Sequence, residues 1–140
     1  MPERTLVIVK PDAMAAGVAA AVLEGIERAG LTLRAARNVW MRGETAEAFY
    51  AEHLGKDFFP GLVEFMSSGP GIVAVFEGEE AVARARAAVG ATDPAKAAPE
   101  TIRGRFGSEL PRNAVHASDS PESARREIAF FFAEADLLGQ

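Results

Sequence analysis

Two uninterrupted runs of apolar, largely β-branched residues constrain the fold of this chain more than any other feature. They cover residues 5–9 and 72–76. Short apolar runs of this kind predict buried strands. Pro11 ends the first run, because proline has no N–H for a sheet ladder and biases Lys10 toward extended geometry. The chain must therefore build its core around a sheet.

The segments between and after these two strands carry helical or edge-strand patterns. Apolar residues at helical spacing predict a helix that starts near Val18 and ends near Gly30, a suitable capping residue. Residues 31–41 are apolar with polar interruptions, which is typical of an edge strand, and Thr45 is expected to cap a short helix that reaches about His53. The remaining expected elements are helices over residues 58–66 and 79–89, a short strand at 114–115, and a helix capped by Ser120, with Pro121 first, that runs to about residue 133.

This order of elements reads as βαββαβ, the ferredoxin-like arrangement of the α+β class. It predicts an antiparallel four-stranded sheet covered by helices on one face. At 140 residues, the chain is expected to be one domain over residues 1–140. The first and last strands are neighbours in such a sheet. Lys10 and His116, which end those strands, can therefore share a cleft.

Residues 90–112 contain several prolines and glycines and no sustained period. Loops longer than about 12–15 residues in a compact domain are usually functional or disordered. This one carries Thr92, Arg103 and Arg105, so we interpret it as functional.

Composition excludes several classes of protein. The chain has no cysteine, and so no disulfide framework or thiolate chemistry. No apolar run approaches the ~18 residues of a membrane span. The N-terminus lacks a signal-peptide pattern, which makes a cytoplasmic location the expectation. The net charge of −5 argues against a nucleic-acid binder, but it does not exclude a small anionic ligand met by local arginines.

His116 is the most informative polar residue. It follows the expected strand at 114–115 and precedes the helix signal that begins at Ser118, so its imidazole is held in place yet can face a cleft. An unperturbed imidazole is mostly neutral at pH 7 and can act as a nucleophile or base. Taken alone, it could equally be a histidine packed at a helix N-terminus. The other histidine, His53, is expected on a polar helix face without a role.

Five segments together resemble one family, the nucleoside diphosphate kinases, in the family's order and spacing. They are Val9-Lys10-Pro11-Asp12, Phe58-Phe59-Pro60-Gly61-Leu62, Ser68-Gly69-Pro70, Thr101-Ile102-Arg103-Gly104, and the run from Asn113 through His116 to Ser120. The resemblance covers essentially the whole chain. It implies ping-pong transfer of the γ-phosphoryl of a nucleoside triphosphate, mainly ATP, through a phosphohistidine on His116. In the family the δ nitrogen is the nucleophile, which implies that Glu127 holds the other ring nitrogen and that Ser118 supports Glu127.

The resemblance also assigns the remaining residues of the expected site. Arg86, Arg103 and Thr92 would hold the phosphates, Lys10 and Tyr50 would lie near the transferred group, Lys10 and Asn113 would meet the ribose, and Phe58 would stack on the base with Leu62 beside it. Mg²⁺ is the implied cofactor, held mainly by phosphate oxygens and water rather than by a protein ligand set, with Asp119 acting through water. The implied partners are nucleoside tri- and diphosphates and further copies of the chain, as a hexamer or, second, a tetramer. No membrane or nucleic-acid partner is expected.

The chain departs from the common family pattern at positions that bear on loop geometry. Ala13 and Ala117 stand where the family usually has glycine, and Gly71 stands where it usually has a β-branched residue. Arg105 replaces a residue that is often acidic, and Pro111 replaces one that is often glycine. None of these removes a matched chemical group. The alternative interpretation is a non-catalytic ferredoxin-like nucleotide-binding module, which would need neither His116 nor Glu127. Acid-labile phosphate on the protein after exposure to ATP distinguishes the two.

Overall fold

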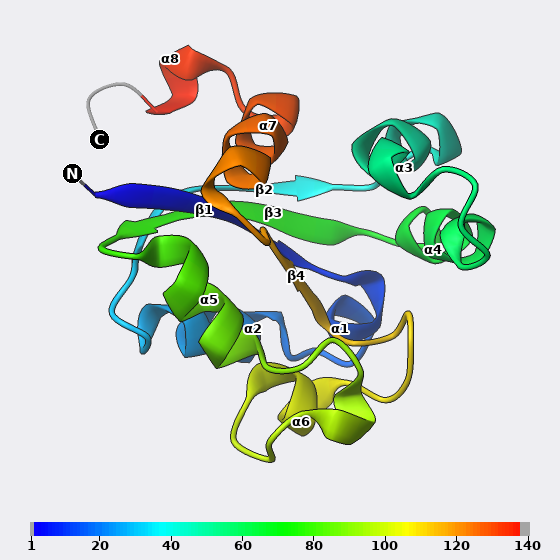
Figure 1. Cartoon of the computed structure of the whole chain (residues 1–140), viewed down its shortest axis with the longest axis horizontal. Helices are drawn as coiled ribbons and strands as arrows, with labels where there is room; N and C mark the ends of the chain where they lie inside the picture. The colour runs from blue at the N-terminus through cyan, green and yellow to red at the C-terminus, as the bar shows by residue number, and fades with distance from the viewer. Residues whose placement is uncertain (1, 138–140) are drawn as a thin grey trace.

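The two apolar runs form the central strands of one four-stranded antiparallel sheet, with strand order β2-β3-β1-β4 (Figure 1). This computed structural model describes residues 2–137, so Met1 and residues 138–140 of the expected domain lie outside the described residues. The strands are β1 (Glu3–Val9), β2 (Thr32–Val39), β3 (Gly71–Gly78) and β4 (Val115–Ala117). The α+β ferredoxin-like prediction is confirmed.

Helices and short 3-10 turns connect the strands. They are α1 (Pro11–Ala15), α2 (Ala19–Glu27), α3 (Gly43–Phe49), η1 (Ala51–His53), α4 (Phe59–Met66), α5 (Ala81–Val89), η2 (Pro94–Lys96), α6 (Ile102–Phe106), α7 (Pro121–Phe131) and α8 (Glu134–Leu137). No helix within residues 2–137 is long and apolar enough to cross a membrane.

Helices cover both faces of the sheet, and the expectation of one covered face is wrong. Figure 1 shows α3, α4 and α7 on one side and α2 and α5 on the other. Alternate residues of β1 point into two separate cores: Leu6 and Ile8 pack with α3, α4 and α7, while Val7 and Val9 pack with α2 and α5. A strand buried on both faces has no polar alternation, which is why residues 5–9 read as a continuous apolar run.

Several local expectations need correction. Pro11 does not only end β1; it is the first residue of α1, a position that suits its fixed φ and missing N–H. Thr45 is not a cap, because α3 begins at Gly43 after Arg42 and has no side-chain cap. The segment 90–112 contains two short helical pieces, η2 and α6. The start of α7 is as predicted, since the Ser120 hydroxyl oxygen accepts from the Ser123 N–H at 3.0 Å.

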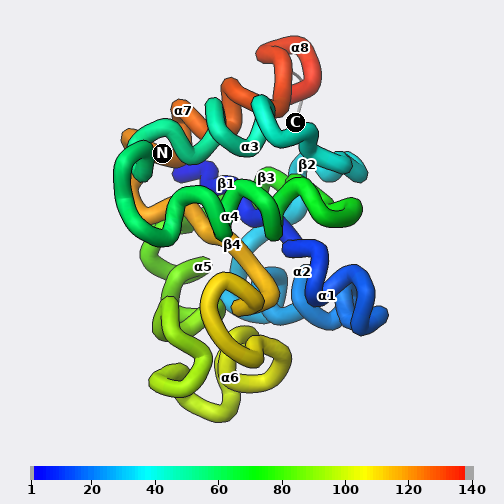
Figure 2. Tube along the Cα trace, turned by 90° about the vertical axis from the view of Figure 1, so that its right-hand side faces the viewer, coloured from blue at the N-terminus to red at the C-terminus, as the bar shows by residue number. Residues whose placement is uncertain are grey.

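The pairing of β1 with β4 positions the functional end of the sheet. Ile8 lies opposite His116 in this antiparallel ladder. Just beyond it, the Lys10 N–H donates to the Ala114 carbonyl at 2.9 Å. Ala114 has a left-handed φ of 73°, and its own N–H donates to the Asp12 carboxylate at 3.0 Å. These contacts turn the chain sharply just before β4, the strand that carries His116. Seen from the side, β4 passes between the two helical layers (Figure 2).

Candidate active site

The predicted functional side chains converge on one cavity of about 530 Å³ at this end of the sheet. Such a volume is typical of a small-molecule site. Every predicted side chain except Ser118 lines it: Lys10, Tyr50, Phe58, Leu62, Arg86, Thr92, Arg103, Asn113, His116 and Glu127. Ser118 is fully buried behind Glu127.

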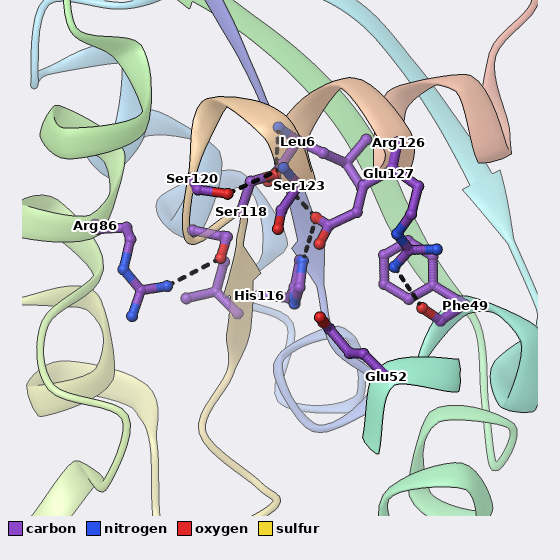
Figure 3. A network of polar contacts seen from close by, with 12 residues as sticks. Leu6, Phe49, Glu52, Arg86, His116, Ser118, Ser120, Ser123, Arg126 and Glu127 are labelled. Carbon is purple, nitrogen blue, oxygen red and sulfur yellow. Dashed lines mark hydrogen bonds and ion pairs between the residues drawn. The ribbon is translucent and has the colours of Figure 1, made fainter. Parts of the chain in front are cut away.

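His116 lies on β4, and its ring is oriented by a chain of hydrogen bonds (Figure 3). Its Nε2 is 2.8 Å from Oε1 of Glu127, which lies on α7. The Ser118 hydroxyl donates to the same carboxylate oxygen at 2.8 Å. Because a carboxylate accepts, Nε2 carries the proton, and Nδ1 keeps a lone pair for a ligand. The ring itself is largely buried.

Glu127 is held in its charged form although it is buried. Burial alone would raise its pKa, but the hydrogen bond and charge of His116, the Ser118 hydroxyl and the Arg126 guanidinium together lower it. A buried carboxylate that accepts two hydrogen bonds stays ionised at neutral pH. It can therefore stabilise positive charge on the His116 ring.

Lys10 is buried, lines the cavity, and has an amide rather than a carboxylate as its close partner. Its Nζ donates to the Asn113 side-chain oxygen at 2.6 Å, and the Asn113 amide donates in turn to the Thr92 carbonyl at 2.9 Å. Burial and then the charge of Arg103 lower the pKa of Lys10 to about 7, against a raising effect of Asp12. An anionic ligand would therefore stabilise the charged form of this group.

Two arginines supply most of the positive charge in the cavity. Arg103, on α6, donates to the carbonyls of Gly90 at 3.1 Å and Val115 at 2.8 Å. Burial and then the nearby Arg86 charge lower the pKa of Arg103 to about 10, so it remains protonated at pH 7. Arg86, on α5, donates to the Ala117 carbonyl at 3.1 Å. Both guanidinium groups are fixed in place by backbone carbonyls, and within residues 2–137 neither forms an ion pair with a carboxylate, which suits them to bind phosphate.

Aromatic rings pack around the histidine. Phe49 and Tyr50 meet the His116 ring edge-on, with centroid distances of 5.5 and 6.0 Å. The Tyr50 hydroxyl is buried and has no hydrogen-bond partner among the described residues. Burial and then the Glu127 charge raise the pKa of Tyr50, so the hydroxyl keeps its proton and can donate to a ligand.

The mouth of the cavity offers an apolar surface. Phe58, which precedes α4, is 53% exposed, and Leu62, which is buried, lines the same cavity. An exposed aromatic ring at the rim of a polar cavity offers a face on which a planar group can stack.

His53 belongs to this cavity wall, which the sequence did not indicate. We expected it on a polar helix face, but η1 places its ring beside Tyr50 and Phe58. Its spacing of three residues from Tyr50 on a helical turn is the signal that could have found it.

The described residues do not provide a metal site of their own. Within residues 2–137, no three Asp, Glu or His side chains gather closely enough to hold an ion. Asp119 lines the cavity, while the Glu127 carboxylate is engaged by His116 and Ser118. A cation in this cavity would need its other ligands from a substrate and from water.

Comparison with known proteins identifies the family. The sequence profile described as "Nucleoside diphosphate kinase" matches residues 3–137. The chain belongs to the nucleoside diphosphate kinase family. A nucleoside diphosphate kinase of Rhodococcus opacus is 53% identical over 135 residues, which are 96% of this chain and 97% of that protein. One from Archaeoglobus fulgidus is 49% identical over 136 residues, 97% of this chain and 90% of that protein.

Solved structures agree. The nucleoside diphosphate kinase of Aquifex aeolicus superposes with a TM-score of 0.94 at 45% identity, over 99% of this chain and 100% of that one. The enzyme of Halobacterium salinarum, solved in complex with CDP, superposes with a TM-score of 0.95 at 40% identity, over 100% of this chain and 93% of that one. The chain is therefore an enzyme, a phosphotransferase with nucleoside diphosphate kinase activity.

The positions where the chain departs from the common nucleoside diphosphate kinase pattern are accommodated without loss of a polar group. Ala13 and Ala117 are buried in the core that packs with α2 and α5. Gly71 is packed so closely that a Cβ there would lie 2.7 Å from the Val9 carbonyl oxygen. A β-branched residue could therefore occupy this position only if the neighbouring backbone shifted. Arg105 stacks over the Phe106 ring at 4.5 Å, and Pro111 lines the cavity.

Proposed function

We propose that this kinase works by a ping-pong mechanism, in which Nδ1 of His116 takes the γ-phosphoryl of a nucleoside triphosphate, mainly ATP, and passes it to a nucleoside diphosphate. One observation carries the proposal: Glu127 engages Nε2 at 2.8 Å. This bond fixes the tautomer that keeps the Nδ1 lone pair free. His116 lines the same cavity as Arg86 and Arg103, where phosphates would be held.

Both half-reactions are in-line substitutions at one phosphorus. In the first, Nδ1 attacks the γ-phosphorus, an N–P bond forms, and the P–O bond to the β-phosphate breaks, so that the diphosphate leaves with that oxygen and its electron pair. In the second, a terminal oxygen of another diphosphate attacks, and the N–P bond breaks and returns a neutral imidazole. Glu127 stabilises the positive ring charge that arises with each N–P bond.

Phosphoryl transfer depends more on positioning and charge stabilisation than on covalent help. We assign phosphate binding to Arg86, Arg103 and Thr92. A unit charge pair at 4 Å is worth about 4 kcal/mol at an effective dielectric near 20, so two fixed guanidinium groups outweigh the weakly acidic background of the whole chain.

The other cavity residues orient the nucleotide. Lys10 and Asn113 would hold the ribose, and Lys10 with the unpartnered hydroxyl of Tyr50 would lie beside the transferred group. Phe58 would stack on the base, with Leu62 supporting the same surface. The Halobacterium salinarum relative was solved in complex with CDP, which supports nucleotide binding by this chain.

Mg²⁺ fits the site only as a partner of the nucleotide, since the described residues gather no ligand set for it. Asp119, which lines the cavity, would hold it through water. The bound ion would neutralise phosphate charge. The arginines, Lys10 and His116 would carry out the binding and transfer described above.

The proposal extends to the state of the protein in the cell. We expect residues 1–140 to act as one catalytic domain in the cytoplasm, on nucleotides and not on nucleic acid. We expect a homo-oligomer built from dimers, a hexamer before a tetramer. The edge strand β2 supports this, because it exposes Leu33 and is followed by Trp40, which is 65% exposed.

Initial-rate kinetics test the mechanism. Double-reciprocal plots with ATP and GDP should give parallel lines, and His116→Ala and His116→Gln should both abolish turnover while ADP still binds by calorimetry. Glu47→Ala, exposed on α3, is the control that should match wild type. Intersecting lines would contradict the phosphoenzyme. Nucleotide binding without turnover in the wild type would indicate the non-catalytic module instead.

A further inference from the structure

The base-stacking ring proposed above, Phe58, is half exposed and needs something to fix its orientation. Its ring packs edge-on against His53, with centroids 5.1 Å apart and planes at 60°. The Lys56 ammonium lies 5.7 Å from the Phe58 centroid. Edge-to-face aromatic pairs prefer this separation and geometry. Phe58 is therefore backed by a small cluster from the same connection between α3 and α4.

His53 makes three further contacts, with Lys56, Glu52 and Tyr50. The Lys56 ammonium donates to its Nδ1 at 3.1 Å, so this nitrogen accepts and Nε2 carries the proton. Nε2 lies 3.9 Å from the Glu52 carboxylate. The ring also lies nearly parallel to Tyr50, at 23° with centroids 6.2 Å apart.

These contacts form a continuous row of rings from the mouth of the cavity to the nucleophile. Phe58 contacts His53, His53 lies over Tyr50, and Tyr50 meets the His116 ring edge-on at 6.0 Å. His53 is the link between the proposed base platform and the residues around the reacting atom. It also faces the cavity, although the family motifs in the sequence do not include it.

We infer that His53 is a positioning residue for base recognition: its ring holds Phe58 in the orientation that stacks on the base and joins that platform to Tyr50. The inference rests on the proposed role of Phe58 in the proposed function. Without the His53 ring, Phe58 keeps its place in the chain but can rotate freely at the cavity mouth. A base must then order the ring as it binds, so binding weakens while the phosphates still reach His116.

The test is a double-mutant cycle between His53 and Phe58, read as the KM for GDP and as the dissociation constant for ADP by calorimetry. His53→Ala should raise both by roughly three- to tenfold, the range expected for an aromatic pair, with kcat reduced by less than about twofold. In the Phe58→Ala background, His53→Ala should change neither constant further, because the ring it positions is gone.

Two single variants separate ring packing from polar contact and from general structure. His53→Phe keeps an aromatic ring and should restore the wild-type KM to within about twofold. His53→Gln keeps an acceptor for Lys56 and should behave like His53→Ala. Melting temperatures of all variants show whether each is folded, and Glu47→Ala is the matched exposed control on α3.

The inference would be overturned by an unchanged KM in His53→Ala, by the same fold-change in the presence and absence of Phe58, or by rescue with Gln but not with Phe. A loss of kcat with unchanged KM would also overturn it. If Phe58→Ala alone leaves KM unchanged, the proposed base contact fails and the inference falls with it. If Phe58→Ala raises KM but the cycle shows no coupling, only the role of His53 fails.

Discussion

At the scale of single residues, the hydrogen-bonded chain Ser118–Glu127–His116 leaves Nδ1 as the ring nitrogen that would attack phosphorus in the proposed mechanism. One carboxylate oxygen receives hydrogen bonds from both Nε2 of His116 and the Ser118 hydroxyl, each at 2.8 Å. The same carboxylate is kept charged by these contacts. The proposed nucleophile, His116, thus depends on Glu127, a residue that a nucleotide need not touch.

Glu127→Gln tests that dependence. The amide keeps the shape but loses the charge that stabilises the phosphorylated ring, and it can present an N–H to Nε2 and favour the wrong tautomer. We expect single-turnover phosphorylation to slow by roughly 10²-fold, with the ADP dissociation constant changed less than about threefold. Rapid-quench measurement of the labelled protein checks the rate. A weakened ADP affinity with an unchanged single-turnover rate would contradict the role.

The burial of Lys10 suits it to an anionic ligand but lowers the free energy of unfolding of the nucleotide-free protein. The folded-state pKa of Lys10, about 7, lies below the ordinary lysine value of 10.5. Between these values the unfolded chain binds more protons than the folded chain, so this residue makes stability rise with pH over that window. Well below pH 7, where Lys10 is protonated in both states, the buried ammonium destabilises the nucleotide-free protein by the full amount.

Lys10→Met should therefore raise the free energy of unfolding at pH 7, by roughly 1–3 kcal/mol, because a buried charge is replaced by an apolar side chain of similar length. The gain should shrink as pH rises from 7 toward 10. Kinase activity should fall at least tenfold, which is the trade-off common at functional sites. Urea denaturation at several pH values measures the effect. A variant less stable than wild type at pH 7 would show that the bond to Asn113 outweighs the cost of burial.

At the scale of elements, the site depends on how the α3–α4 segment is docked against α7. Arg126 on α7 donates to the Phe49 carbonyl at 2.8 Å, at the last turn of α3 (Figure 3). Its guanidinium also lies 5.7 Å from the centroid of the Phe49 ring. A cation at a helix C-terminus satisfies an orphan carbonyl and favours the helix dipole.

Arg126→Ala should loosen this docking. We expect faster amide hydrogen exchange across α3 and α4, and a melting temperature lower by a few degrees, as a loss of about 1 kcal/mol implies for a domain of this size. Arg126→Lys should recover part of both effects because it keeps the charge. Uniform exchange changes across the whole sheet, or none in α3 and α4, would contradict a local docking role.

The sequence predicts the elements of this fold better than their arrangement. The central strands were predictable because burial on both faces leaves an unbroken apolar run, yet that same pattern should have indicated two covered faces. The start of α7 followed from Ser120 and Pro121, whose roles are local. The start of α3 did not, because that helix begins without a side-chain cap and is held by packing.

The candidate site was likewise predictable from the sequence only in part. Residues in the segments that resemble family motifs, such as His116 and Arg103, could be proposed from the sequence, and the structure brings both to one cavity. The membership of His53 in the cavity could not, because it depends on a 3-10 turn that rotates its ring toward Phe58. Asp12 is similar: its carboxylate holds Ala114 in a left-handed conformation from 102 residues away, a contact that no local pattern encodes.

At the scale of the whole molecule, β2 leaves an open sheet edge. Leu33 is 38% exposed, Trp40 is 65% exposed, and this edge would otherwise invite uncontrolled pairing. We predict a closed homo-oligomer, hexameric before tetrameric, in sedimentation velocity at micromolar protein. Leu33→Lys should shift it toward smaller species, while Glu47→Ala should not. A monomer at all concentrations would contradict this prediction.

The central claim is that the phosphoryl group passes through one side chain, His116. The most direct test is to incubate the protein with γ-labelled ATP without an acceptor, map the label by mass spectrometry under alkaline conditions, and then add GDP. We predict acid-labile label on His116, none on His53, transfer of that label to GTP, and no labelled protein from His116→Ala. Label on any other residue, or GTP formation by His116→Ala, would contradict the account.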